Sequence, residues 1–292
     1  MKNERENIKM SDKKVRIIVD SASDLAEGIA EKVTVLPMTL RFGDTEYVDG
    51  VNITNKEFYE KLIESDELPT TSQIMPLAFE EAYRETIEAG EDVIVITISS
   101  KLSGTYQSAC IAKEEVEGNV YVVDSLSAAI GEGILVEYAV RLKEQGKSAA
   151  EIASALEEKR HNVRLIAMLN TLEYLKKGGR ISKTVAFAGE LLSIKPVVSI
   201  ENGEVNLLGK ARGSRQANNL LVKEIEKAGG VDFDMPLLLG FTGVEDSLLR
   251  KYVEDSKALW EGQDDKLRSS SIGSIVGTHV GPGAVAVAFF KK

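Results

Sequence analysis

The segment at residues 92–108, DVIVITISSKLSGTYQS, constrains the fold of this chain more than any other stretch. Its first part, from Val93 to Ile98, is almost continuously apolar, which is typical of a parallel strand covered on both faces. Hydroxyl side chains and a glycine follow at residues 99–105, where we expect the strand to end and a helix to begin. Ligands of open α/β sheets lie beyond the carboxyl ends of the strands. The segment therefore predicts an α/β fold with a ligand site at this loop.

Two other predicted strands, at residues 15–19 and 119–123, also end in small polar loops. The sequence DSASD follows the first of them and DSLS follows the second. Each of the three loops is expected to open a helix, at residues 25–31, 105–116 and 128–145. Carboxyl ends of parallel strands meet at one edge of a sheet, so the loops together predict a polar rim there. Serine and aspartate are also favoured helix N-caps, and capping alone explains any one loop.

The strands and helices expected in the rest of the sequence predict two α/β domains. Residues 1–14 are polar and are expected to form a flexible extension, followed by an N-terminal α/β domain at 15–161 and a C-terminal α/β domain at 162–292. Thr54 and Glu57 have the spacing of a capping box at a helix start. The other expected elements are a strand at 33–40, an irregular loop at 68–73, a strand at 163–169, a hairpin at 195–208 turning at Asn202-Gly203, a strand at 236–241, a strand at 268–276, a loop at 277–283 and a strand at 284–290.

Charge and composition exclude several classes of protein. The chain of 292 residues has 36 Lys and Arg against 46 Asp and Glu, a net charge of −10, which argues against nucleic acid or an anionic membrane as the main partner. Cys110 is the single cysteine, so a disulfide framework within the chain is impossible and a cytoplasmic location is expected. The sequence lacks 18 consecutive apolar residues and an apolar segment near its start, so we expect neither a membrane span nor a signal peptide.

Familiar cofactor motifs are missing from the sequence. The loop after the strand at 92–98 lacks the spacing of a phosphate loop, and no glycine-rich dinucleotide fingerprint follows a strand. With two histidines and one cysteine, a zinc site is not expected either. Asp20, Asp24 and Asp124 have the oxygen ligands that Mg²⁺ prefers, but helix capping is the simpler interpretation. We therefore expect no metal and no cofactor.

Three residues outside these motifs are candidates for a functional site. Ser103 lies at the turn from strand to helix, and His279 lies between glycines in a segment expected to be a loop. Hydroxyls beside an imidazole suit a carboxylate ligand, although they also suit a serine esterase that uses Ser103 and His279. The sequence around Ser103 is not the G-x-S-x-G of a nucleophile elbow. Arg180 follows Gly178-Gly179, where an ordinary surface arginine is the alternative.

Five short segments, taken in order, resemble the marker segments of the DegV family. They begin near residue 16 and continue to the C-terminus: DSASD at 20–24, TTSQ at 70–73, SSKLSGT at 99–105, LEYLKKGGRI at 172–181 and GTHVGPG at 277–283. Each segment alone is a weak signal, whereas the ordered set is specific. The N-terminal extension is the clear addition to the family pattern.

The resemblance implies a protein that binds one long-chain fatty acid between a mainly parallel N-terminal domain and a C-terminal domain with a mixed sheet. FakB-type members of the family are not enzymes. They carry the fatty acid to a separate fatty acid kinase, which phosphorylates the carboxylate for phospholipid metabolism. By resemblance, Thr71 and Ser103 hold the carboxylate and His279 lies close by. Arg180 matches an arginine that is implicated in transfer with the partner kinase.

The chemistry of the residues agrees with this expectation. Hydroxyl and imidazole groups bind a carboxylate, and an apolar slot would bury the tail. About 15 buried methylenes contribute roughly 12 kcal/mol before ordering costs, so the tail would dominate affinity. Candidate walls are the apolar residues 185–192 and Phe241, for which an ordinary core is the alternative. A serine esterase and a phosphotransferase subunit with a related fold remain open at this stage.

Overall fold

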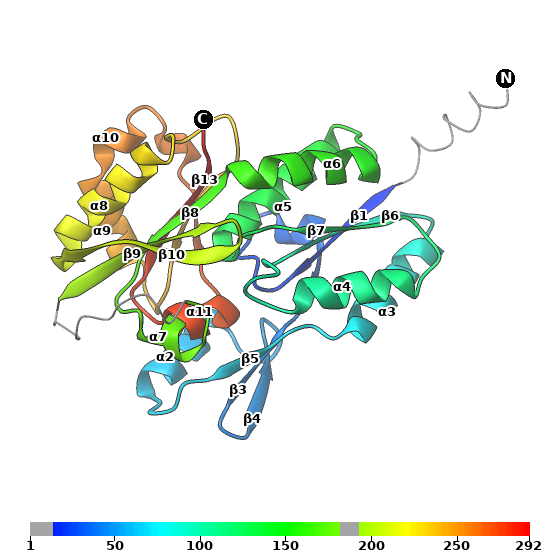
Figure 1. Cartoon of the computed structure of the whole chain (residues 1–292), viewed down its shortest axis with the longest axis horizontal. Coiled ribbons are helices and arrows are strands. Elements are labelled where there is room, and N and C mark those ends of the chain that lie inside the picture. Colours follow the sequence, from blue (N-terminus) through cyan, green and yellow to red (C-terminus); the bar gives the residue numbers. More distant parts are fainter. Residues whose placement is uncertain (1–13, 182–192) are drawn as a thin grey trace.

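The computed structural model describes residues 14–181 and 193–292, and its helices and strands form two lobes with a small sheet below them (Figure 1). The first lobe contains a parallel sheet in the order β2-β1-β6-β7. Its strands are β1 (Val15–Asp20), β2 (Thr34–Leu36), β6 (Asp92–Thr97) and β7 (Val120–Asp124). All six residues of β6 are buried, as expected for a strand that is covered on both faces.

The order of these strands places a crevice at the predicted site. The chain leaves β1 to form β2 on one side and later returns to form β6 on the other side of β1. Ligand crevices of open α/β sheets lie at such a reversal of strand order, beyond the carboxyl ends. The loops at residues 20–24 and 98–104 both begin at this edge.

A three-stranded antiparallel sheet projects from the first lobe (Figure 1). Its strands are β3 (Thr39–Phe42), β4 (Thr45–Val48) and β5 (Thr70–Ser72), in the order β4-β3-β5. The prediction of one strand at 33–40 was wrong, because the chain breaks between β2 and β3 at Pro37, which has no backbone N–H to donate. The predicted irregular loop at 68–73 was also wrong in part. Thr71 lies in β5 and is paired in register with Leu40.

The second lobe contains a mixed sheet in the order β10-β9-β8-β13-β11-β12, which confirms the predicted fold class. Its strands are β8 (Val163–Met168), β9 (Ile194–Glu201), β10 (Glu204–Arg212), β11 (Leu237–Phe241), β12 (Ser269–Ser271) and β13 (Val285–Phe290). The hairpin between β9 and β10 turns at Asn202 and Gly203, with φ values of 51° and 84°. Two positive φ values are the signature of a type I′ turn, and the prediction at this position is confirmed.

Helices cover both faces of the sheets. In chain order they are η1 (Ala30–Lys32), α2 (Asn55–Glu64), α3 (Pro76–Glu88), α4 (Thr105–Glu114), α5 (Ala129–Glu144), α6 (Ala149–Lys159), η2 (Arg160–Asn162), α7 (Glu173–Lys177), α8 (Gly213–Lys227), α9 (Ser247–Asp255), α10 (Lys257–Trp260), η3 (Asp264–Lys266) and α11 (Ser274–Val280). The capping box that Thr54 and Glu57 predicted is present at the start of α2. None of the helices within the described residues has the length and apolar character needed to cross a bilayer.

Helix α5 joins the two lobes. It packs on β1 and β6 of the first sheet and on β8, β11 and β13 of the second. Gly133 permits this close approach, because a Cβ at that position would lie 2.5 Å from the backbone oxygen of Asp24. One continuous hydrophobic cluster includes side chains from both lobes. The division into domains at residues 161 and 162 therefore remains a prediction.

Three predicted elements near the site were wrong in whole or in part. The helix expected at 25–31 is only the short turn η1, and Gly28 with a φ of 78° interrupts the segment. The strand expected at 268–276 ends at Ser271, and the loop expected at 277–283 is largely the helix α11. His279 consequently lies in the last turn of a helix, which Gly281 ends with a φ of 71°.

Candidate functional site

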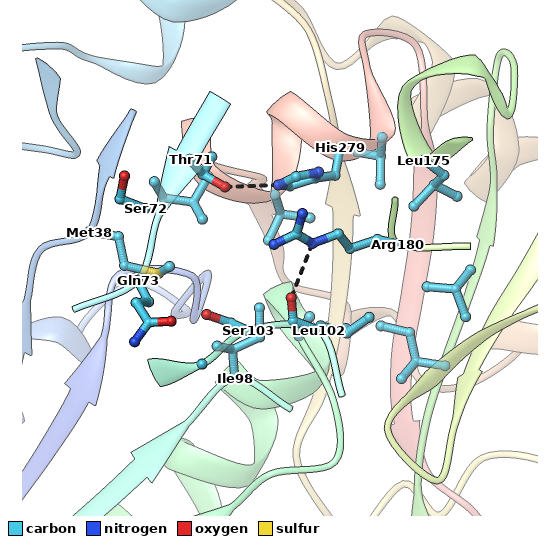
Figure 2. A pocket seen from close by; sticks show the side chains of 17 residues that line it. Met38, Thr71, Ser72, Gln73, Ile98, Leu102, Ser103, Leu175, Arg180 and His279 are labelled. Carbon is cyan, nitrogen blue, oxygen red and sulfur yellow. Dashed lines mark hydrogen bonds between the residues drawn. The ribbon is translucent and has the colours of Figure 1, made fainter. Parts of the chain in front are cut away.

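A cavity of about 360 Å³ lies between the two lobes (Figure 2). Its volume falls within the range of small-molecule sites. Most of its lining is apolar and comes from β6–α4, α5, α7, the β9–β10 hairpin and α11. These apolar residues are Met38, Ile98, Leu102, Ala128, Leu175, Ile200, Val205, Ile275, Val276 and Val280. The polar lining comprises Thr71, Ser72, Gln73, Ser103, Arg180 and His279.

Thr71 and His279 both line this cavity, and their side chains point toward one another (Figure 2). The Thr71 Oγ1 and His279 Nε2 atoms are 2.9 Å apart and form a hydrogen bond. Strand β5 holds Thr71 by its pairing with β3, whereas α11 holds His279 from the other end of the chain. The tertiary structure thus joins two of the residues that the sequence singled out.

Three buried side chains fix the start of α11 and thereby the position of His279. Asp24 Oδ1 accepts the backbone N–H of Gly273 at 2.7 Å, and Ser274 Oγ donates to Asp49 Oδ1 at 2.5 Å. Tyr59 donates its hydroxyl to the backbone oxygen of residue 272 at 2.9 Å. The backbone groups at a helix start have no partner within the helix, and these contacts anchor that end of α11. They explain why a glycine-rich segment becomes helical here.

The His279 imidazole is neutral in the folded protein. Burial, and then the positive charge of Arg180, lower the pKa of His279 to about 4. Its Nδ1 atom is buried without a hydrogen-bond partner, and Gly178 lies so close that a Cβ there would be 2.3 Å from Nδ1. A buried donor without a partner is costly, so the ring proton belongs on Nε2. Nε2–H then donates to Thr71 Oγ1, which leaves the Thr71 hydroxyl hydrogen able to point at a ligand.

Ser103 lies immediately before helix α4 and lines the same cavity. Its Oγ is 2.9 Å from Thr105 Oγ1 and accepts the backbone N–H of Thr105 at 3.3 Å. The residue that caps α4 is Gly104, which has no side chain to satisfy the first turn. The hydroxyl of Ser103 therefore stays at the wall of the cavity beside the start of a helix.

Arg180 spans the cavity wall from the second lobe to the first (Figure 2). Its Nε donates to the backbone oxygen of Leu102 at 3.1 Å, and its Nη1 donates to that of Gly178 at 2.6 Å. The guanidinium thus fixes the loop before Ser103 and places a positive charge beside the cavity. Arg180 is therefore half-buried in the site and is not an ordinary surface residue.

Two aspartates of the polar loops, Asp20 and Asp124, are not helix caps. Asp20 Oδ1 and Oδ2 accept the backbone N–H groups of Ala22 and Ile98, at 3.0 and 2.8 Å. Asp124 Oδ1 accepts the N–H groups of Ser100 and Leu126, at 3.2 and 3.0 Å. The capping interpretation was wrong because these carboxylates connect neighbouring loops. In the described part of the chain, no group of three or more His, Cys, Asp or Glu residues has the geometry of a metal site.

Burial changes the protonation of the acids beneath the cavity. Burial raises the pKa of Asp20 to about 7, against the opposing effect of its backbone hydrogen bonds. The pKa of Asp24 is also raised, first by burial and then by the charges of Asp49 and Asp20. The acids are therefore more often neutral at physiological pH than exposed carboxyls are.

Several wall residues were not predicted from the sequence. Met38, Leu175 and Ile200 are ordinary apolar residues in their own segments, and only the packing of the two lobes brings them together. Of the walls that were predicted, residues 185–192 lie outside the described residues. Phe241 does not line the cavity and packs against the second hydrophobic cluster, so that prediction was wrong.

The geometry does not assemble a serine hydrolase. His279 Nε2 contacts Thr71, whereas Ser103 contacts Thr105, so the imidazole is not placed as the base for Ser103. His279 Nδ1 also lacks the carboxylate partner that orients the histidine of a catalytic triad.

A family model described as "Uncharacterised protein, DegV family" matches residues 14–292. The chain belongs to the DegV family. A DegV domain-containing protein of Caldanaerobacter subterraneus is 35% identical, with 96% of this chain and 99% of the relative covered. Another from Clostridium acetobutylicum is 36% identical, with 96% and 99% covered. These matches confirm the resemblance that the ordered marker segments predicted.

Solved structures of DegV proteins have the same fold. One from Thermus thermophilus, described as showing fatty acid binding, is 32% identical with a TM-score of 0.84 and covers 95% of this chain and 99% of its own. A stearic acid-binding protein from Eubacterium ventriosum is 27% identical with a TM-score of 0.84 and covers 95% and 98%. The similarity extends over 95% of this chain in both cases and therefore over both lobes.

Proposed function

We propose that this protein binds one long-chain fatty acid without altering it, and presents the carboxylate to a separate fatty acid kinase for phosphorylation to an acyl phosphate. The observation that carries the proposal is a cavity whose lining is mostly apolar and includes hydroxyls beside a neutral imidazole. The fatty-acid binding described for similar DegV structures supports it. The single cysteine further motivates a cytoplasmic location as part of the proposal.

The head group binds through hydroxyl donors. The Thr71 and Ser103 hydroxyls donate to the carboxylate, while His279 Nε2–H occupies the acceptor side of Thr71 and turns its hydrogen toward the ligand. A neutral histidine keeps this arrangement over the physiological pH range, because its pKa is near 4. Arg180 contributes positive charge to the wall and serves the transfer step with the kinase.

The apolar walls hold the tail. Each buried methylene contributes about 0.8 kcal/mol, so the tail supplies most of the affinity and the polar groups set its direction. An acyl chain that enters with its carboxylate at Thr71 and Ser103 leaves the reactive oxygen near the cavity opening, where Ser72 and Gln73 are exposed.

Mass spectrometry of gently purified protein tests the proposal. We expect a co-purified fatty acid with a chain of about 14–18 carbons, the size class whose burial gives the gain estimated above. Thr71→Ala or Ser103→Ala should weaken binding by about 1–3 kcal/mol, since each removes a donor to a charged group. An empty protein that also binds no fatty acid in titration contradicts the proposal. Hydrolysis of p-nitrophenyl esters that disappears in Ser103→Ala would favour the esterase instead.

A further inference from the structure

Gln73 connects the two segments that carry the proposed head-group hydroxyls. It follows β5 directly, two residues after Thr71, and lines the cavity at its opening. Its Nε2 donates to Ser108 Oγ at 2.9 Å. Ser108 is buried on α4, the helix that begins just after Ser103. One hydrogen bond therefore joins the strand on one side of the opening to the helix on the other.

Gly104 provides the surface on which the Gln73 carboxamide rests. A Cβ on Gly104 would lie 1.9 Å from Gln73 Oε1, and its three nearest atoms would all belong to Gln73. The φ of Gly104 is −74°, which any residue adopts, so space and not backbone conformation requires glycine here. Figure 2 shows the Gln73 carboxamide beside Ser103, in agreement with this contact.

We infer that Gln73 is a positioning residue, which rests on Gly104 and bonds Ser108 to set the spacing of the Thr71 and Ser103 hydroxyls. The inference deepens the proposed function and depends on it, because the spacing matters only if both hydroxyls bind one carboxylate. Gln73 is exposed, yet its carboxamide bonds Ser108 through Nε2 and its Oε1 lies against Gly104. It acts through Thr71 and Ser103 and requires no contact of its own with the ligand.

A direct contact between Gln73 and the ligand is the competing explanation. The carboxamide has a second N–H that the hydrogen bond to Ser108 does not use. In that case the loss of the Ser108 hydroxyl would have little effect on the affinity for the carboxylate. The losses of affinity from changing Gln73 and Ser108 would then be independent. A positioning role instead makes the two changes equivalent, because either one breaks the same connection.

The first test compares binding of palmitate and 1-hexadecanol to the full chain after its lipid is removed. Gln73→Ala and Ser108→Ala should each weaken palmitate binding about tenfold and leave hexadecanol binding within about twofold, since only the carboxylate needs two placed donors. The double variant should bind palmitate no more weakly than either single variant. Gln107→Ala, an exposed glutamine on the same helix, is the matched control and should bind both ligands as the wild type does.

The second test uses Gly104, because Ser108 is buried and its replacement could disturb folding. Gly104→Ala should weaken palmitate binding about as much as Gln73→Ala does, since the new methyl group displaces the carboxamide. In the Gln73→Ala background the same Gly104→Ala change should have no further effect, because the obstructing side chain is gone. Urea unfolding of each variant confirms that the folded state is being compared.

The outcomes separate the inference from the proposed function. Additive losses for Gln73 and Ser108, equal losses for both ligands, or a Gly104→Ala effect that persists without Gln73 would each overturn the positioning role. A wild-type protein without preference for palmitate over hexadecanol would overturn the proposed head-group site itself. That failure is visible before any variant is measured.

Discussion

Glu132, in the first turn of α5, is a buried acid whose replacement should stabilise the protein at high pH. Its side chain is fully buried, and neither carboxylate oxygen has a hydrogen-bond partner. Burial, followed by the charges of Asp20, Asp24 and Asp124, raises its pKa well above the ordinary value. The folded protein therefore keeps a proton on Glu132 that the unfolded chain releases.

Because the folded and unfolded chains bind this proton with different affinities, the free energy of unfolding depends on pH. A raised folded pKa means that stability is full below the ordinary pKa of glutamate and is lost as the pH rises toward the folded pKa. Each pH unit between the ordinary pKa of glutamate and the raised folded pKa costs about 1.4 kcal/mol of unfolding free energy, so the cost grows with pH until the folded acid itself ionises. Glu132→Leu removes the group that binds the proton. Unlike a replacement by glutamine, it also does not bury an amide without hydrogen-bond partners.

Urea unfolding at pH 5, 6.5 and 8 measures the effect. We expect Glu132→Leu to match the wild type within about 1 kcal/mol at pH 5, as for a swap of similar volume, and to gain stability relative to the wild type at each higher pH, by up to about 1.4 kcal/mol per pH unit. Glu88→Leu, at an exposed site on α3, is the control and should show no such pH dependence. An advantage that does not grow with pH would refute the conclusion that Glu132 is buried as a neutral acid.

Three further changes test other parts of the structure. Gly178→Ala places a methyl group 2.3 Å from His279 Nδ1 and should weaken fatty-acid binding about tenfold in calorimetric titration, because a displaced imidazole no longer directs the Thr71 hydroxyl at the ligand. Unchanged affinity would contradict the role of the imidazole. Gly281→Ala puts a side chain on a residue with a φ of 71° and places its Cβ 2.3 Å from the Tyr174 ring. It should lower the free energy of unfolding in urea by about 1–3 kcal/mol. An unchanged unfolding midpoint would show that the helix end adapts freely. Arg180→Ala should retain its lipid, as measured by mass spectrometry, but its bound fatty acid should no longer be phosphorylated by the kinase. Loss of the lipid would show instead that Arg180 holds the ligand.

Local sequence determined those elements whose stability depends on their own residues and near neighbours. The apolar run of β6 specified a buried strand, and the spacing of Thr54 and Glu57 specified the start of α2. Asn202 and Gly203 specified a hairpin, because few residue pairs tolerate two positive φ values. The ordered marker segments specified the family, and four of the five supply residues that line the cavity.

Only the tertiary structure decided how these pieces form a site. Residues 274–280 were expected to be the end of a strand followed by a loop, and they become helical because distant Asp24, Asp49 and Tyr59 hold the start of the helix. Thr71 and His279 are 208 positions apart, so no local pattern could predict their hydrogen bond. Local propensities describe a few neighbouring residues, whereas the cavity, its neutral histidine and its buried acids arise from two lobes packed around α5.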